Sequence, residues 1–212
     1  MKVIITGTTG YVGEGILLTC LEDDRIEKVL SVSRRSCGPS HPKLEEYLVP
    51  DFMQIPADDP KLHGYDAVFF CAGISSVGCP ADQYKIISHD IPIHFAEAVA
   101  PKESMTFIYL SGAGTSDKNP QAWAKVKSAT EKELIAMPFK GAFGFRPAFM
   151  KPYKDQKFIT GVQKSFAYLY PIFKLLGQGN TIQDVENAMV IVSQKGYASN
   201  FISVKDIRKM RR

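Results

Sequence analysis

The sequence has little that points to a membrane, metal or nucleic-acid protein. Its apolar stretches are short and interrupted by polar residues, so none is expected to span a bilayer. The four cysteines show no metal-binding spacing, so no metal site is predicted. The net charge of +4 comes from scattered residues, apart from the basic tail 209–212. That tail is typical of a solvated helix end, so we expect no nucleic-acid partner and no membrane partner.

We also expect no secretory leader. Residues 2–6 already have the pattern of a strand that runs into a glycine-rich turn, where a secretory signal would have a longer apolar segment. Cysteines without such a signal favour reduced thiols in a reducing compartment. We therefore expect a cytoplasmic protein.

What the sequence does contain is an alternation of apolar runs and helical patterns. Helical spacing covers 11–21, 81–100 and 121–137, and Pro92 is expected to kink the second of these helices. Near-continuous apolar strands are typical of a parallel sheet covered on both faces. With right-handed crossovers this predicts a doubly wound α/β fold in the order 3-2-1-4-5-6. The expected strands are 2–6, 27–33, a short one within 47–55, and then 66–71, 106–110 and 142–145.

The composition changes after Pro147. An aromatic segment over 157–176 precedes a helical pattern over 182–193, and Ser203 with Asp206 resembles a capping box that opens a last helix. The tail is too short to fold independently. We therefore expect one domain over 1–212, in which 147–212 forms a lid over a ligand site.

A glycine-rich turn follows the first expected strand, in the sequence Thr6-Gly7-Thr8-Thr9-Gly10-Tyr11-Val12-Gly13. Gly7 permits a tight turn, Gly10 lets the backbone approach a pyrophosphate, and Gly13 lets the helix pack closely on the strand. The helix N-terminus then offers free N–H groups to phosphate. This predicts a Rossmann-type dinucleotide site. The residues expected to bind the cofactor in this turn are Gly7, Thr8, Thr9, Gly10, Tyr11 and Val12.

The end of the second expected strand suggests which dinucleotide binds. NAD-binding proteins often have an acidic residue there, but this chain has Arg34 and Arg35. A guanidinium can hold a 2′-phosphate with two hydrogen bonds, so the sequence favours NADP, with NAD as the alternative. A pair of surface arginines with no ligand is the other interpretation.

Two further segments are expected beside the cofactor. Cys71-Ala72-Gly73 ends the fourth strand with small residues, as a backbone running close beneath a ligand requires. Asp51 and Phe52 follow the third strand, where the adenine would lie. A loop acid and a core aromatic residue remain an equally good interpretation of this second pair.

Together these segments resemble the short-chain dehydrogenase/reductase superfamily, and in particular its atypical NAD(P)H-binding members. The branch that includes the mammalian Tat-interacting tumour-suppressor protein is the most similar. The resemblance covers nearly the whole chain, and Pro147 is expected at the cofactor. The segments that carry it are the glycine turn, Leu110-Ser111-Gly112-Ala113-Gly114, Trp123-Ala124-Lys125-Val126-Lys127 with Glu131, Phe145-Arg146-Pro147, Tyr170-Pro171, Ala188-Met189 and Asp206-Ile207-Arg208.

The resemblance implies a catalytic serine, tyrosine and lysine. Ser111 matches the serine, which holds the substrate oxygen, and Lys127 matches the lysine, which binds the nicotinamide ribose. The tyrosine position is occupied by Trp123. An indole N–H only donates hydrogen bonds and cannot replace a phenol in proton transfer. Trp123 is therefore expected to form a wall beside the nicotinamide, or else a core contact.

No other residue is an obvious replacement for the missing acid. Tyr153 follows the sixth strand at the edge where a ligand would bind, but a surface turn explains it as well. His89 and His94 lie on a helix, where structural roles are more common. We adopt none of the three.

Two hypotheses follow for the function. The first is an NADP-dependent oxidoreductase that acts on a small carbonyl or alcohol through Ser111 and Lys127. The second is a non-catalytic regulator, in which the bound cofactor sets the conformation of the aromatic segment 158–173 for a protein partner. The run 166–170 would then form the contact surface for this partner or for a homodimer, and a pocket lined by the same run is an equally good interpretation.

Overall fold

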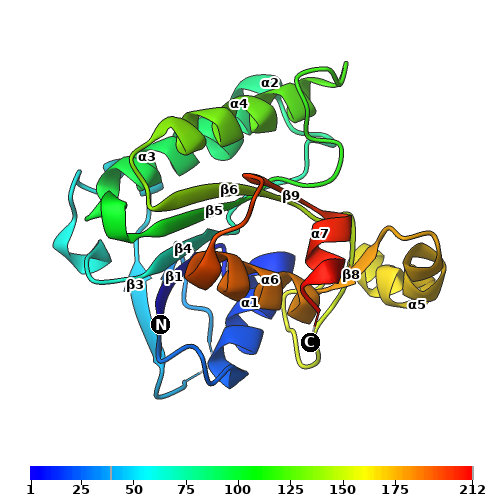
Figure 1. The fold of residues 1–212 in the computed structure, drawn as a ribbon, viewed down its shortest axis with the longest axis horizontal. Coiled ribbons are helices and arrows are strands. Elements are labelled where there is room, and N and C mark those ends of the chain that lie inside the picture. The colour runs from blue at the N-terminus through cyan, green and yellow to red at the C-terminus, as the bar shows by residue number, and fades with distance from the viewer. Residues whose placement is uncertain (39, 212) are drawn as a thin grey trace.

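A seven-stranded parallel sheet in the order β3-β2-β1-β4-β5-β6-β9 forms the centre of the molecule (Figure 1). This computed structural model describes residues 1–38 and 40–211, with the backbone alone at 162 and 164–167. The predicted doubly wound order is confirmed, with one strand added beyond β6. The strands are β1 (Lys2–Thr6), β2 (Lys28–Ser33), β3 (Leu44–Leu48), β4 (Ala67–Phe70), β5 (Thr106–Leu110), β6 (Gly141–Arg146) and β9 (Phe201–Ser203).

Helices cover both faces of this sheet (Figure 1). On one face lie α1 (Tyr11–Glu22) and α6 (Ile182–Lys195), and on the other lie α2 (Ala81–Lys85), α3 (Ile91–Ala98) and α4 (Ala122–Ala136). A small second sheet pairs β7 (Phe149–Lys151) with β8 (Gly179–Thr181). Helix α5 (Gly161–Leu175) projects from the side of the molecule beside this pair, and α7 (Val204–Lys209) ends the chain.

Each face of the sheet packs against its helices in a separate apolar core. In β1, Val3 and Ile5 point toward α1 and α6, whereas Ile4 points toward the layer of α3 and α4. All three side chains are fully buried, which explains why a central parallel strand has no polar alternation. Burial of one such side chain contributes about 1.5–3 kcal/mol. The two cores hold the carboxyl ends of β1, β4 and β5 at one edge.

The third strand begins earlier in the chain than the predicted short strand within 47–55. It covers Leu44–Leu48, and the rest of the predicted 47–55 contains a 3₁₀ turn, Phe52–Gln54, that begins at Asp51. Strand β3 lies at the edge of the sheet, where its side chains are half-buried or exposed. An edge strand of this kind carries little apolar pattern, so its position was misread.

The helix predicted over 81–100 is interrupted, but not by a simple proline kink. A π-helical turn, Ile86–Asp90, joins α2 to α3, and Pro92 lies in the first turn of α3. Pro92 has no N–H to donate to the carbonyl of Ser88. The Tyr109 hydroxyl and the Thr130 hydroxyl donate to that carbonyl instead, at 2.7 and 2.9 Å. The wider turn is therefore stabilised by side chains from β5 and α4.

The tail 147–212 only partly matches the predicted lid. Helix α6 is a core element, since Ile182, Val185 and Met189 are fully buried against α1 and the sheet. Strand β9 extends the sheet itself. The strands β7, β8 and β9 were missed because three residues each give no readable period. The capping box is confirmed, because the Ser203 hydroxyl accepts a hydrogen bond from the Asp206 N–H.

Candidate nucleotide-binding site

A cavity of about 750 Å³ opens at the carboxyl edge of the sheet. It lies where β1 and β4, which are neighbours in the sheet, send their connections to opposite faces. Ligands of doubly wound sheets bind at this point. The lining residues are contributed by the ends of five strands and by α1, α4 and α5. Of the residues predicted to form the site, the cavity brings together Gly7, Thr9, Gly10, Tyr11, Val12, Arg34, Arg35, Phe52, Cys71, Ala72, Gly73, Ser111, Trp123, Lys127 and Pro147.

The structure gives a different explanation for each of the three glycines in the turn. Gly7 has a φ of +72°, and a Cβ there would lie 2.7 Å from the backbone of Ala72. A Cβ at Gly13 would lie 2.1 Å from the Gly7 carbonyl oxygen. The fold itself therefore requires glycine at 7 and 13. A Cβ at Gly10 would lie 3.3 Å from the same oxygen, which a small shift relieves. Gly10 thus leaves open backbone beside the cavity that the fold alone does not need.

The first turn of α1 faces this open backbone. Gly10 is the N-cap residue and brings no capping side chain to the N–H groups that follow. Glu14, the acid of that turn, points its carboxylate elsewhere, since it accepts the N–H groups of Lys157 and Phe158 at 2.6 and 2.7 Å. The positive end of α1 is therefore left to the cavity, which suits a phosphate.

Arg34 and Arg35 line the cavity at the end of β2, and both side chains are exposed. The Ser33 hydroxyl donates to the Arg35 carbonyl at 2.5 Å, which fixes the turn that carries them. Within the part of the chain that the structure describes, no ion pair involves either guanidinium. Both are available to an anionic ligand.

Two predicted cofactor residues lie outside the cavity lining. Thr8 is fully buried, and its hydroxyl is 2.7 Å from that of Ser31. Asp51 accepts the Met53 N–H at 2.9 Å and so begins the 3₁₀ turn after β3. Their side chains are occupied by local structure. Phe52 does line the cavity, but it also packs against Phe95, with ring centroids 5.9 Å apart.

The connection after β4 runs directly beneath the turn. The Thr6 hydroxyl accepts the N–H groups of Cys71 and Ala72, both at 3.1 Å. Burial raises the pKa of the Cys71 thiol to about 12. That thiol is therefore protonated at neutral pH and serves as a small wall.

Ser111, Trp123 and Lys127 meet at the other end of the same cavity. The Ser111 hydroxyl lies 2.5 Å from Glu131 Oε1 and 3.1 Å from the Phe145 carbonyl. A hydroxyl has one proton, and here it is donated to a carboxylate. Ser111 is thus directed into the protein and not toward a substrate oxygen.

Glu131 also binds Arg146. From the sequence, Arg146 was noted only as part of the segment Phe145-Arg146-Pro147 and was given no role. Arg146 Nε lies 3.0 Å from Oε1 and Nη2 lies 2.5 Å from Oε2. The Glu131 side chain is fully buried. A Cβ at Gly144 would lie 2.2 Å from Oε1, so Gly144 makes the space for this carboxylate. Sequence reasoning missed the cluster, because α4 and β6 reveal their contact only in the fold.

Lys127 lies on α4 with its ammonium group against the end of β5. Nζ donates to the Ser111 carbonyl at 2.7 Å and to the Leu110 carbonyl at 3.3 Å, and it lies 5.6 Å from the Tyr109 ring centroid. Burial lowers the pKa of Lys127 to about 8, against the opposing effect of the Glu131 charge. Lys127 also lines the cavity.

Trp123 lies one helical turn before Lys127 and forms a wall of the cavity. Its indole N–H donates to the Gln121 side chain at 2.6 Å. The ring covers Gly114, where a Cβ would lie 3.4 Å from it. The indole is therefore held by local contacts.

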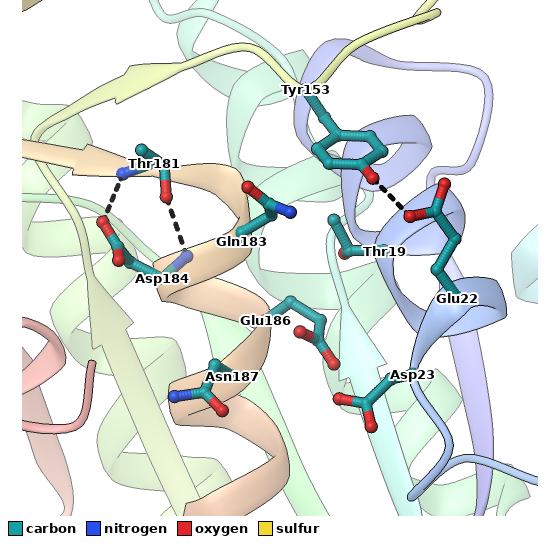
Figure 2. A pocket seen from close by; sticks show the side chains of 9 residues that line it. All are labelled: Thr19, Glu22, Asp23, Tyr153, Thr181, Gln183, Asp184, Glu186 and Asn187. Atoms are coloured by element: carbon teal, nitrogen blue, oxygen red, sulfur yellow. Dashed lines mark hydrogen bonds between the residues drawn. The ribbon is translucent and has the colours of Figure 1, made fainter. Parts of the chain in front are cut away.

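The other candidate acids lie elsewhere. Tyr153 donates to Glu22 at 2.6 Å and faces a separate, acidic pocket of about 320 Å³ between α1 and α6 (Figure 2). His89 contacts the carboxylates of Asp90 and Glu133, and His94 contacts the Ile55 carbonyl. Figure 2 shows Glu186 and Asn187 on α6, with Asp23 across from them at the end of α1. The structure gives none of these residues access to the cavity at the sheet edge.

Several lining residues were not predicted individually. Ala148 and Met150 follow β6, and Gln163 lies in the first turn of α5. The Tyr11 hydroxyl donates to the Met150 carbonyl at 2.5 Å, so α1 and β7 close this side together. These residues could have been predicted from the sequence, because loops that follow parallel strands meet at the carboxyl edge of the sheet and the segment after 147 begins with such a loop.

No metal-binding cluster of three or more histidine, cysteine or acidic residues occurs among residues 1–38 and 40–211. In the same part of the chain, no helix has the length and apolar character needed to cross a membrane.

Comparison with solved structures defines the class of fold. UDP-glucuronic acid 4-epimerase from Bacillus cereus in complex with NAD superposes with a TM-score of 0.69 at 14% identity, covering 96% of this chain and 76% of that one. ADP-L-glycero-D-manno-heptose-6-epimerase from Helicobacter pylori gives 0.65 at 16% identity, covering 97% and 78%. The chain therefore has the Rossmann-type fold that these epimerases share with a dTDP-glucose 4,6-dehydratase from Bacillus anthracis solved in complex with NAD.

Curated relatives by sequence are FMP52 proteins. The Chaetomium globosum protein is 30% identical over 155 residues, which is 69% of this chain and 65% of that protein. The Aspergillus fumigatus protein is 25% identical over 176 residues, covering 76% and 75%. The match to the Chaetomium protein thus spans less than two thirds of its length. No protein-family model matches the chain. The similarity to the Tat-interacting branch stays a prediction.

The expected cytoplasmic location is wrong by this comparison. The FMP52 relatives from Chaetomium, Scheffersomyces, Aspergillus, Candida and Eremothecium are all named mitochondrial proteins. The strand pattern of residues 2–6 bears on secretion alone, so it gave no information on a mitochondrial location.

Proposed function

We propose that the chain binds a nicotinamide dinucleotide, NADPH in preference to NADH, and that it reduces a small carbonyl compound with it. The observation that carries the proposal is one cavity that combines an uncapped helix N-terminus, open backbone at Gly10 and two unpaired arginines. A phosphate at α1 and a 2′-phosphate at Arg34 match these groups in charge and position. When bound, the dinucleotide would supply a hydride.

The residues of the chain would then have separate tasks. Gly10 and the first turn of α1 would hold the pyrophosphate, and Arg34 the adenosine phosphate. Lys127 would bind the nicotinamide ribose, and Trp123 would shield the reacting end from water. Pro147 and Met150 also line the cavity. Solved structures of the same fold in complex with NAD support a nicotinamide dinucleotide as the ligand.

The test is calorimetric titration of the protein with NADPH and NADH, followed by turnover on a panel of small aldehydes and ketones. Tight NADPH binding with carbonyl-dependent oxidation at 340 nm supports the proposal. If the protein binds neither NADPH nor NADH, the proposal is wrong.

A second candidate function is a cofactor-responsive binding protein. It is favoured by α5, which contributes Gln163 to the cavity and exposes Tyr168, Ile172 and Leu175 on its surface. A ligand that contacts Gln163 would thereby act on the helix that carries this apolar face. The side chains of Phe166 and Ala167, also predicted for such a surface, lie outside the described ones. Analytical ultracentrifugation with and without NADPH tests this second function. A change in the mass of the sedimenting particle on addition of NADPH supports it.

A further inference from the structure

We propose that Lys127 is the proton donor of the cavity and delivers a proton to the oxygen of the carbonyl substrate. This rests on the proposed reductase function. The carbonyl π bond breaks as a hydride from the dihydronicotinamide forms a C–H bond and the Lys127 ammonium forms the O–H bond. The dinucleotide is oxidised and the carbonyl is reduced to an alcohol. The neutral amine then recovers a proton from water.

Few side chains in the cavity can release a proton near neutral pH. The ionisable side chains that line it are Tyr11, Arg34, Arg35, Cys71 and Lys127. Burial raises the pKa of Tyr11 and of Cys71 to about 12. Guanidinium groups do not release a proton near neutral pH. Lys127 is the remaining group of this described lining that can exchange a proton there.

Two backbone carbonyls hold the Lys127 ammonium group in a fixed orientation. It has three N–H bonds, and the carbonyls of Ser111 and Leu110 accept two of them. The third N–H is available to an acceptor in the cavity, which Lys127 lines. The two carbonyls fix Nζ at the end of β5, next to Trp123 one turn earlier. A substrate oxygen placed there meets a donor that is already oriented, and it accepts the N–H that would otherwise bind the nicotinamide ribose.

The groups around Nζ set the pKa of Lys127. Glu131 on α4 favours the charged form, but Arg146 from β6 pairs with that carboxylate and offsets its charge. The Tyr109 ring from β5 faces the ammonium. Desolvation dominates, and the pKa falls from 10.5 to about 8. An acid with a pKa near the working pH is both protonated and able to give up its proton, which is what general acid catalysis requires.

The arrangement also explains why Trp123 is tolerated. A lysine that only assisted a phenol would lose its chemical role once the phenol is replaced. Here the lysine is retained with its carbonyl anchors, and the Ser111 hydroxyl is turned toward Glu131. The backbone carbonyl of Ser111, and not its hydroxyl, then serves the reaction by holding the donor in place.

Nuclear magnetic resonance of the free protein tests the donor without any turnover. With ¹³C-labelled lysine, the Lys127 Cε signal is assigned by its loss in Lys127→Met. We expect a titration midpoint near 8. A midpoint at the ordinary lysine value, above about 10, overturns the proposal.

Kinetics of Lys127→Arg, with Lys125→Arg on the same helix as the matched control, test the step itself. The arginine keeps the charge and the donors, so the Kd for NADPH should change by less than about fivefold. The rate of carbonyl reduction should fall about 10²–10⁴-fold, the usual contribution of a general acid. In the wild type, the rate should fall tenfold per pH unit above the midpoint. An active Lys127→Arg overturns the donor role and leaves the reductase function standing. A wild type that binds NADPH but reduces no carbonyl overturns both.

Discussion

Glu131 and Arg146 form a two-pronged ion pair in which the carboxylate is fully buried and its oxygens lie 3.0 and 2.5 Å from the guanidinium nitrogens. The pair joins α4 to the end of β6. Because Oε1 also accepts the Ser111 proton, it fixes β5 as well. One buried carboxylate thus sets the relative positions of three elements that line the cavity.

Removal of one partner of this pair should destabilise the protein strongly. In Arg146→Met the Glu131 carboxylate stays buried without its counter-charge, and loss of one partner typically costs about 3–5 kcal/mol. The free energy of unfolding in urea measures the effect. The double variant Glu131→Met/Arg146→Met should be less destabilised than the single one, since no charge is stranded. An Arg146→Met protein as stable as the wild type would contradict this account.

Arg34 should decide the choice between the dinucleotides. Arg34→Ala removes a hydrogen-bonded charge from the 2′-phosphate, a contact of about 1.5–3 kcal/mol, or roughly ten- to a hundred-fold in affinity. NADPH affinity should fall by that factor, while NADH affinity should change little. Isothermal titration with both nucleotides measures this. Equal affinities in the wild type would refute the preference.

Gly10→Val should abolish nucleotide binding and leave the fold intact. The Cβ meets only the Gly7 carbonyl, at 3.3 Å, but the side chain would stand where the pyrophosphate approaches. Gly13→Val should unfold the protein, because its Cβ would lie 2.1 Å from that oxygen. Circular dichroism and titration separate the two effects. Gly161→Ala, on α5, is a control expected to bind normally. Retained affinity in a folded Gly10→Val protein would mean that the nucleotide binds elsewhere.

Trp123→Tyr should increase carbonyl-dependent NADPH oxidation. It places a phenol one helical turn from Lys127, and a general acid contributes about 10²–10⁴ in rate. The gain should vanish in Trp123→Tyr/Lys127→Ala. Trp123→Phe should match the wild type, because the indole N–H is donated to Gln121. A loss of turnover in Trp123→Phe would instead give the indole a part in the reaction.

Lys127 should make stability depend on pH in the alkaline range. Its pKa is lowered to about 8 in the folded protein from 10.5, so between these values the unfolded chain binds more protons and stability rises with pH. Lys127→Met removes this dependence. It should be more stable than the wild type at pH 7, by up to about 3 kcal/mol, and the difference should shrink as the pH approaches 10.5. Unfolding curves at several pH values test this, and a constant difference would argue against the burial effect.

The sequence predicted the parts of the site that depend on local spacing. Gly7, Gly10 and Gly13 were assigned correctly to a turn between a strand and a helix, because their roles follow from consecutive residues. The Ser111 side chain was misread, since its hydroxyl bonds to Glu131, twenty positions away along the chain. Contacts of that kind depend on how α4 lies on the sheet. Strand β3 was misplaced for the opposite reason, since an edge strand is under little packing constraint.

The place of α6 and β9 in the fold has a consequence for how the chain is made. Both are encoded after the cavity residues, yet α6 covers Ile5 and Ile16, and β9 completes the sheet beside β6. A nascent chain that has emerged only as far as β6 therefore exposes an open sheet edge and an uncovered apolar face. Such surfaces bind chaperones or aggregate. Residues of α6 and β9, which leave the ribosome after β1 and α1, thus protect those earlier elements from association.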